Sequence, residues 1–177
     1  MGRKILFSPV GGTDPISQNN LHDGALLHIC RWYQPDDVYM YMSDEIIKKR
    51  DADNRYIYCL DRLSEKTGHT MNYHEIERPD LDKVYDFNFF YNDFKKELDQ
   101  IIGEADESDT IYLNISSGTP AMKSGLLVLA TLLDYRCKLI QVVTPVGKMN
   151  EHNHDENDIE MLWELDEDND DDAVNRC

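Results

Sequence analysis

The sequence has no apolar run that approaches the roughly 20 residues needed for a membrane-spanning helix. The apolar run near the amino terminus, within residues 1–9, is too short for a secretory signal peptide. We therefore expect a cytoplasmic protein without a membrane partner. The chain has 177 residues, which is enough for one domain with a sizeable core.

Cysteine pairs and metal-ligand patterns are also missing. The four cysteines are widely spaced and form no CxxC motif, so we expect reduced thiols. His152 and His154 lie among acidic residues, but a solvated loop explains that composition better than a metal site. Neither a GxGxxG nor a Walker motif occurs, so we expect no cofactor of the NAD or ATP kind.

Basic residues are scarce. The chain has 18 lysines and arginines against 35 acidic residues, a net charge of −17. Residues 151–177 hold 12 of the acidic residues and one basic residue, which leaves 23 acidic and 17 basic residues in 1–150. We therefore divide the chain into a domain, 1–150, and an acidic loop or linker, 151–177. Neither part has the basic face that binds long nucleic acid, so an anionic ligand must be small and held by N–H groups and hydroxyls.

The most informative stretch is residues 111–122, which read IYLNISSGTPAM. Its first half predicts a buried strand, and the small polar residues after it predict a tight loop. Thr119 is a favourable helix N-cap and Pro120 suits the first helical position. The almost wholly apolar residues 121–133 then predict a helix that is packed on both sides. Such a loop suits a phosphate, although a well-capped turn is the simpler interpretation.

Apolar periodicity predicts strands that alternate with helices along residues 1–150. The expected strands are residues 4–9, 38–42, 69–77, 111–115 and 139–144, and the expected helices are 23–33, 44–68 with a local break at 51–54, 87–102 and 121–133. This order predicts an α/β fold: a Rossmann-like, doubly wound, mainly parallel sheet with helices on both faces. The first and fourth strands would be neighbours at the switch point, so the polar loops 10–20 and 116–119 would form a ligand crevice.

Three segments together resemble the sensor domain of CRISPR-associated Rossmann-fold (CARF) proteins, above all that of the type III-A CRISPR accessory ribonucleases. They read ILFSPVGGTDP at residues 5–15, DGALLHI at 23–29 and NISSGTPAM at 114–122. The resemblance covers essentially all of residues 1–150. It implies a homodimer that binds cyclic oligoadenylate and activates a C-terminal HEPN ribonuclease domain in type III CRISPR antiviral defence. We expect that ribonuclease domain to be missing from this chain, with the acidic residues 151–172 close to the junction.

A symmetric ring on the twofold axis of such a dimer would meet each loop twice. We expect residues 116–119 to contact phosphate or ribose and residues 11–14 to wrap a nucleotide. Asp14 has the wrong charge for a phosphate, so we expect it to contact an adenine amino group or a ribose hydroxyl. The full set of expected ligand-binding residues is Ser8, Pro9, Gly11, Gly12, Thr13, Asp14, Ser43, Asn114, Ser116, Ser117, Gly118, Thr119, Pro120 and Met122.

Three residues near the expected site have simpler interpretations. Ser43 follows a strand and suits a helix cap. Met122 would pack on the sheet as readily as on an adenine. Lys123 lies in a first helical turn, where the helix dipole disfavours a cation, so either a phosphate partner or plain solvent exposure would explain it.

Some relatives of this domain cut their own ligand. A ribose 2′-hydroxyl of the ring attacks the adjacent phosphate, which gives a 2′,3′-cyclic phosphate, and the reaction needs no metal. We expect slow ring-nuclease activity of this kind, with Thr119 and the loop amides as the catalytic groups and Asp14 orienting the ribose. The likeness to the type III-A group favours a ring of six adenylates, and four is the alternative.

Three other interpretations stay open. The chain could be a sensor that does not cut its ligand, the sensor of a CARF transcription regulator, or, more remotely, a metabolic Rossmann enzyme. Arg62 and His69 match the Arg–His spacing of HEPN nucleases, but they span the end of a helix and the start of a strand. We therefore expect no HEPN ribonuclease site in this chain.

Overall fold

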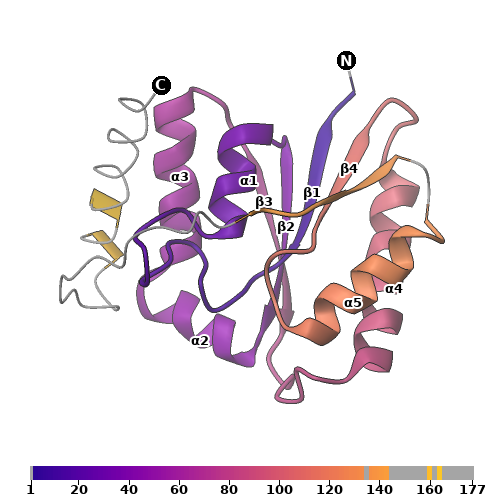
Figure 1. The fold of residues 1–177 in the computed structure, drawn as a ribbon. Helices are drawn as coiled ribbons and strands as arrows, with labels where there is room; N and C mark the ends of the chain where they lie inside the picture. The colour runs from indigo at the N-terminus through magenta and orange to yellow at the C-terminus, as the bar shows by residue number, and fades with distance from the viewer. Residues whose placement is uncertain (1, 134–135, 144–158, 161–162, 165–177) are drawn as a thin grey trace.

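The computed structural model describes residues 2–133, 136–143, 159–160 and 163–164. Its centre is a five-stranded parallel sheet with the order β3-β2-β1-β4-β5 (Figure 1). The strands are β1 (Lys4–Pro9), β2 (Asp37–Ser43), β3 (Asn72–Arg78), β4 (Thr110–Asn114) and β5 (Cys137–Ile140). The helices are α1 (Ala25–Tyr33), α2 (Asp44–Asp53), α3 (Arg55–Thr67), α4 (Phe87–Glu104) and α5 (Pro120–Ala130). The predicted α/β, doubly wound architecture is confirmed.

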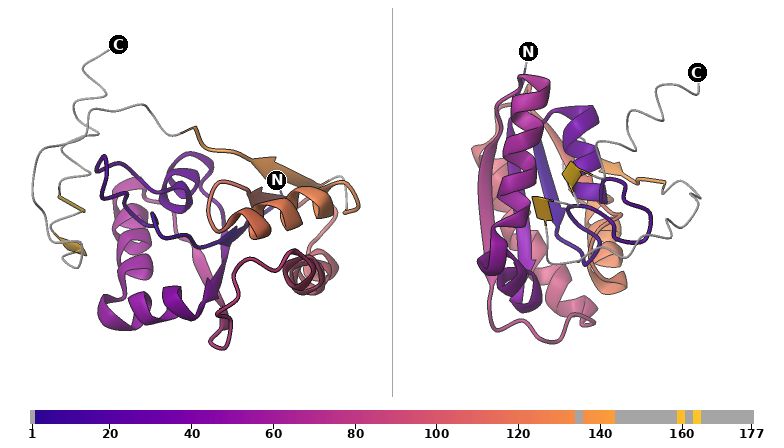
Figure 2. Two further views of the ribbon diagram at one scale, coloured as in Figure 1. Left: turned by 60° about the horizontal axis from the view of Figure 1, so that its bottom comes forward. Right: turned by 90° about the vertical axis from the view of Figure 1, so that its left-hand side faces the viewer.

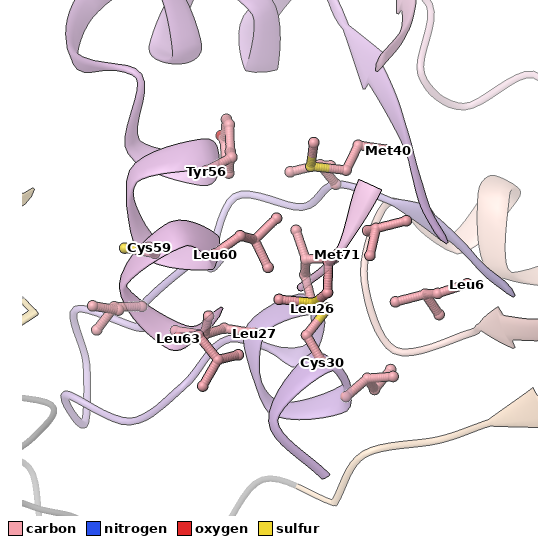
Figure 3. Close-up of a cluster of buried hydrophobic side chains, with 14 of the residues drawn as sticks. Leu6, Leu26, Leu27, Cys30, Met40, Tyr56, Cys59, Leu60, Leu63 and Met71 are labelled. Carbon is pink, nitrogen blue, oxygen red and sulfur yellow. The ribbon is translucent and has the colours of Figure 1, made fainter. Parts of the chain in front are cut away.

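Helices cover both faces of the sheet, with α1, α2 and α3 on one face and α4 and α5 on the other (Figure 2). Successive side chains of β1 point to opposite faces. Leu6 packs in the cluster of α1 and α3 (Figure 3), whereas Ile5 and Phe7 pack in the cluster of α4 and α5. Cys30 and Cys59 are buried in the first cluster as reduced thiols.

β1 and β4 form the switch point of the fold, because β2 and β3 are added to the sheet on one side of β1, and β4 and β5 on the other. These strands pair in parallel, with Ile5 opposite Ile111 and Phe7 opposite Leu113. The loops that follow them leave the same edge of the sheet and touch: a Cβ atom on Gly11 would lie 2.9 Å from the backbone N of Gly118. The predicted neighbours at the switch point are confirmed, and there is no room for a side chain between the two loops.

The helix predicted for residues 44–68 forms two helices. Asn54 adopts a left-handed conformation with φ 54°, which ends α2 and begins α3, so the break predicted at 51–54 occurs at its last residue. Other boundaries shift by a few residues. β3 begins at Asn72 rather than at residue 69, and β5 begins two residues and ends four residues earlier than predicted.

The prediction that the helix at 121–133 packs on both sides is wrong within the described structure. One side of α5 buries Met122 and Leu126 against the sheet and α4. On the other side, Leu127 and Val128 are 51% and 41% exposed. The helix therefore carries a second apolar face toward solvent.

No helix within the described residues is both long enough and apolar enough to cross a membrane.

Candidate ligand site at the carboxyl edge of the sheet

The loop after β4 is held by the buried side chain of Asn114. Its Oδ1 atom accepts hydrogen bonds from the backbone N–H groups of Ser116 (2.8 Å) and Ser117 (3.3 Å). Its Nδ2 atom donates to Ser8 Oγ (2.9 Å) and to Ser117 Oγ (3.0 Å). One amide side chain thus ties the loop after β4 to the end of β1, and all three side chains are buried.

The same loop turns into α5 at Gly118, Thr119 and Pro120. Gly118 has φ 87°, and a Cβ atom there would lie 2.8 Å from Met122 Sδ, so the position requires glycine. Thr119 is the N-cap of α5, since its Oγ1 accepts from the Met122 N–H (3.4 Å), and Pro120 follows it at the first helical position. The predicted cap is confirmed. The hydroxyl of Thr119 also donates to the Val84 carbonyl oxygen at 2.6 Å.

The loop after β1 is organised around the buried carboxylate of Asp14. Its Oδ2 atom accepts from the Gly11 N–H (2.9 Å), and its Oδ1 atom accepts from the Leu26 N–H (3.0 Å) in the first turn of α1. The sequence predicts that Asp23 or a neighbour caps this helix. In the structure Gly24 is the N-cap and has no side chain to bond, so Asp14 supplies that acceptor from twelve residues upstream.

The environment of Asp14 acts on its ionisation in both directions. Burial raises the pKa of its carboxyl above the ordinary value, against hydrogen bonds from Gly11, Leu26 and the Ser117 hydroxyl and the attraction of Lys123. The side chain is only 3% exposed. These contacts favour a role in positioning the loop over direct contact with a ligand.

The expected ligand-binding residues separate into two groups by burial. The buried group holds the loops in place and consists of Ser8, Pro9, Gly11, Asp14, Ser43, Asn114, Ser117 and Met122. The accessible group lies along the edge of the sheet and consists of Gly12, Thr13, Ser116, Gly118, Thr119 and Pro120. Only the second group presents atoms to a ligand in this structure.

The structure also bears on the simpler interpretations. Met122 is 2% exposed and packs in the core with α4 and the sheet. Ser43 is the N-cap residue of α2, but its side chain makes no capping hydrogen bond. Arg62 pairs with Glu65 on α3, and the ring of His69 bonds to the Pro35 carbonyl oxygen. His152 and His154 lie outside the described residues.

A cavity of about 710 Å³ opens beside the two loops. Its lining includes Thr13, Gly24 and Ser116 together with residues 141–143 after β5, where the Val142 N–H donates to Ser116 Oγ at 2.6 Å. Its volume falls in the range of small-molecule sites, about 300–1,000 Å³. Of the accessible loop residues, Thr13 and Ser116 line this cavity.

Sequence reasoning missed one wall of this cavity, which α1 forms with His28, Arg31 and Trp32. The spacing of these residues, i, i+3 and i+4, places them on one helical face, away from the apolar residues that α1 buries. A polar and aromatic helical face of this kind can indicate a ligand site, but it is equally typical of a solvated surface. Only the fold shows that it borders the loops.

This arrangement suits a small anionic ligand with polar groups. Thr13, Ser116 and Lys123, which lies in the first turn of α5, line the cavity. Arg31 contributes little free charge there, because it pairs with Asp23 through two contacts of 2.7 and 2.8 Å. Within the described residues, no three His, Cys, Asp or Glu side chains form a group that could hold a metal ion.

Comparison with known proteins places the chain in a family. The family model of the Cas_Csm6 CARF domain matches residues 74–177, more than half of the chain. A CRISPR system endoribonuclease Csm6 from Mycobacterium tuberculosis (strain ATCC 25618 / H37Rv) is 36% identical over 177 residues, covering 98% of this chain and 41% of the relative. The chain belongs to the Csm6 CARF-domain family. The resemblance predicted from the three sequence segments is confirmed.

Two other members show the extent of this CARF-domain match. A Csm6 endoribonuclease from Streptococcus thermophilus is 37% identical over 151 residues, covering 83% of this chain and 32% of the relative. The solved structure of Enterococcus italicus Csm6 bound to cyclic hexa-2′-fluoro-hexa-dAMP matches with a TM-score of 0.81 at 26% identity, covering 97% of this chain and 40% of that chain. This CARF domain thus spans about two fifths or less of the length of these relatives.

Proposed function

We propose that this CARF domain is a sensor that binds cyclic oligoadenylate at the carboxyl edge of its sheet. The observation that carries the proposal is the meeting of two loops at the switch point, beside a cavity that Thr13, Ser116 and Lys123 line. The E. italicus relative, solved with a cyclic hexanucleotide analogue, supports this class of ligand. A ring of six adenylates is the ligand we expect, with four as the alternative.

The second apolar face of α5 supports a homodimer as the binding form. Leu127 and Val128 on α5 are 51% and 41% exposed, and Leu132 just after the helix is 66% exposed. A second copy of the chain would remove this apolar surface from water. A twofold axis beside α5 would bring two copies of residues 116–119 around one ring. One ring would then bind per two chains.

We expect Thr119, rather than Asp14, to take part in slow cleavage of the ring. The Thr119 hydroxyl lies at the start of α5, where the N–H groups of the first turn stabilise negative charge on a phosphate. Its proton is donated to the Val84 carbonyl oxygen, so contact with a phosphate requires that Thr119 exchange this partner. Asp14 would keep the loop after β1 in place, since both of its oxygens accept backbone N–H groups.

The relatives suggest the consequence of binding. They are named endoribonucleases and are more than twice as long as this chain. We propose that the ring, once bound, activates a HEPN ribonuclease domain that follows the CARF domain in the full-length protein. Within the CARF domain itself we propose no HEPN site.

The proposal is tested by calorimetric titration of the 177-residue chain with cyclic tetra-adenylate and cyclic hexa-adenylate, followed by chromatography of the recovered ligand. We expect tight binding of cyclic hexa-adenylate at one ring per two chains and slow appearance of linear products. A folded chain that binds neither ring would refute the sensor function. Binding with fully intact recovered ligand would refute only the ring-nuclease activity.

A further inference from the structure

The cavity lining joins the loop residues Thr13 and Ser116 to an aromatic wall on α1, formed by His28 and Trp32. Trp32 is 70% exposed, although tryptophan is usually largely buried. Its ring lies 6.1 Å from that of His28, one helical turn earlier, at an interplanar angle of 49°. Among the described residues, the side chain of His28 makes no hydrogen bond.

The cavity lining also carries a cation, which is near enough to the buried carboxylate of Asp14 to lower its pKa. Lys123 lies in the first turn of α5 and lines the cavity together with Ser116. It forms no ion pair within the part of the chain that the structure describes, whereas Arg31, which also lines the cavity, is paired with Asp23. A cation at the start of a helix is unfavourable unless an anion accompanies it.

We infer that this cavity is a nucleotide compartment in which Trp32 and His28 contact the base and Lys123 contacts the phosphate. The inference rests on the proposed function and assigns it residues outside the two loops. Bases stack on exposed aromatic rings regardless of sequence, which contributes about 1–3 kcal/mol per base. A lysine ammonium holds phosphate as a point charge, which the hydroxyls and N–H groups of the loop cannot do.

Tryptophan fluorescence tests the base contact directly. The described chain contains Trp32, which is exposed, and Trp163, which is 2% exposed. In a Trp163→Phe background, fluorescence comes from Trp32 alone, and we expect cyclic hexa-adenylate to quench it over the same concentrations that release heat in calorimetry. Heat without any change in fluorescence would overturn the base contact and leave the sensor function standing. Absence of both signals would refute the two together.

Matched substitutions separate this role from a general surface effect. We expect Trp32→Ala to weaken binding of cyclic hexa-adenylate by about 5- to 150-fold, which corresponds to 1–3 kcal/mol. Trp32→Phe should retain most of the affinity. Tyr85→Ala removes another aromatic ring, 75% exposed and outside the cavity lining, and should have no effect. Equal affinity for Trp32→Ala and the wild-type chain would contradict the inference.

The phosphate contact has its own readout. Lys123→Gln should weaken binding about tenfold and make the affinity less dependent on salt, because one charge contact is removed. Lys138→Gln, on exposed β5 and outside the cavity lining, is the control. If Lys123→Gln left both the affinity and its salt dependence unchanged, Lys123 would not contact phosphate.

Discussion

The two edges of the sheet use polar residues in opposite ways. At the amino edge, charged side chains satisfy one another. Arg3 donates to Asp109 at 2.9 Å and to Asp37 at 3.3 Å, and His74 lies 2.9 Å from Asp37. At the carboxyl edge, the buried side chains of Asn114 and Asp14 are also hydrogen-bonded, but Thr13, Ser116 and Lys123 line a cavity.

This difference separates stability from function. A closed network of charges fixes the strands it joins and has nothing left to offer a ligand. At the carboxyl edge a buried layer around Asn114 and Asp14 holds the loops, and an accessible layer around Ser116 and Thr119 lies above it. Substitutions in the buried layers should therefore change stability, and substitutions in the accessible layer should change binding.

The largest effect is expected from Asp14→Ala. The substitution leaves two buried N–H groups, those of Gly11 and Leu26, without their acceptor, so we expect a loss of about 2–4 kcal/mol in the free energy of unfolding. Asp14→Asn should cost less, because one oxygen remains to accept. Urea denaturation measures both, with Glu107→Gln at an exposed site as the control. A loss below 0.5 kcal/mol for Asp14→Ala would show that the loop does not depend on it.

At the amino edge, Asp109→Asn should lower stability by about 1–3 kcal/mol without changing affinity for the ring. Burial opposes ionisation of Asp109, but hydrogen bonds from the Arg3 and Asp106 N–H groups and from the Arg3 guanidinium outweigh it. Denaturation and calorimetry on the same variant separate the two effects. Weaker ring binding by Asp109→Asn would contradict the division between the edges.

The same residue predicts a pH dependence. The contacts of Asp109 hold its pKa below the ordinary value of 3.8, so the folded state stabilises the ionised form. This stabilisation is present above the unfolded pKa and is lost as the pH falls through the folded one. Wild-type stability should therefore fall in acid below about pH 4, and Asp109→Asn should fall less steeply. Parallel curves for the two proteins would rule out this contribution.

A smaller effect, on binding, is expected at the accessible layer. Thr119→Val should weaken binding of cyclic hexa-adenylate about 10- to 100-fold and abolish linear products, since it removes a hydroxyl from the start of α5. Thr119→Ser should retain both functions. Thr131→Val removes a comparable hydroxyl-to-carbonyl bond, 2.7 Å from Thr131 to Val128 at the end of the same helix, and should change neither. Wild-type binding and cleavage by Thr119→Val would exclude Thr119 from the site.

The smallest effects on stability are expected from alanine substitutions at two glycines, one in each loop. Gly118→Ala should cost about 1–2 kcal/mol, because alanine is strained at φ 87° and its Cβ meets Met122 Sδ at 2.8 Å. Gly12→Ala should change stability by less than 0.5 kcal/mol, since nothing lies within 4 Å of a Cβ there. Thermal denaturation of both variants gives the comparison. Equal losses would mean that the loop after β1 is as tightly constrained as the loop after β4.

Local signals in the sequence predicted the architecture and much of the loop after β4. The cap at Thr119, the proline after it and the glycine before it depend on neighbouring residues, so their pattern is visible along the chain. The alternation of strands and helices likewise predicted the contact between the two loops. Helix and strand boundaries were less accurate, because tertiary packing decides where β3 begins and where α5 ends.

Long-range contacts could not be predicted. Asn114 bonds to Ser8, 106 residues away, and Asp14 bonds to Leu26 in a helix whose own N-cap has no side chain. Both residues look like ligand contacts in the sequence because they are polar residues close to glycines. The wall of His28 and Trp32 was missed for the opposite reason, since its spacing also suits a solvated surface.

The most direct test of the proposed division between the edges is hydrogen exchange, measured by mass spectrometry on the 177-residue chain with and without saturating cyclic hexa-adenylate. We predict that the ring slows exchange in peptides that cover residues 11–28 and 116–123. Exchange in peptides that cover residues 2–5, 36–38 and 106–110 should not change. Protection confined to the amino edge, or no protection at residues 116–123 despite bound ligand, would contradict the account.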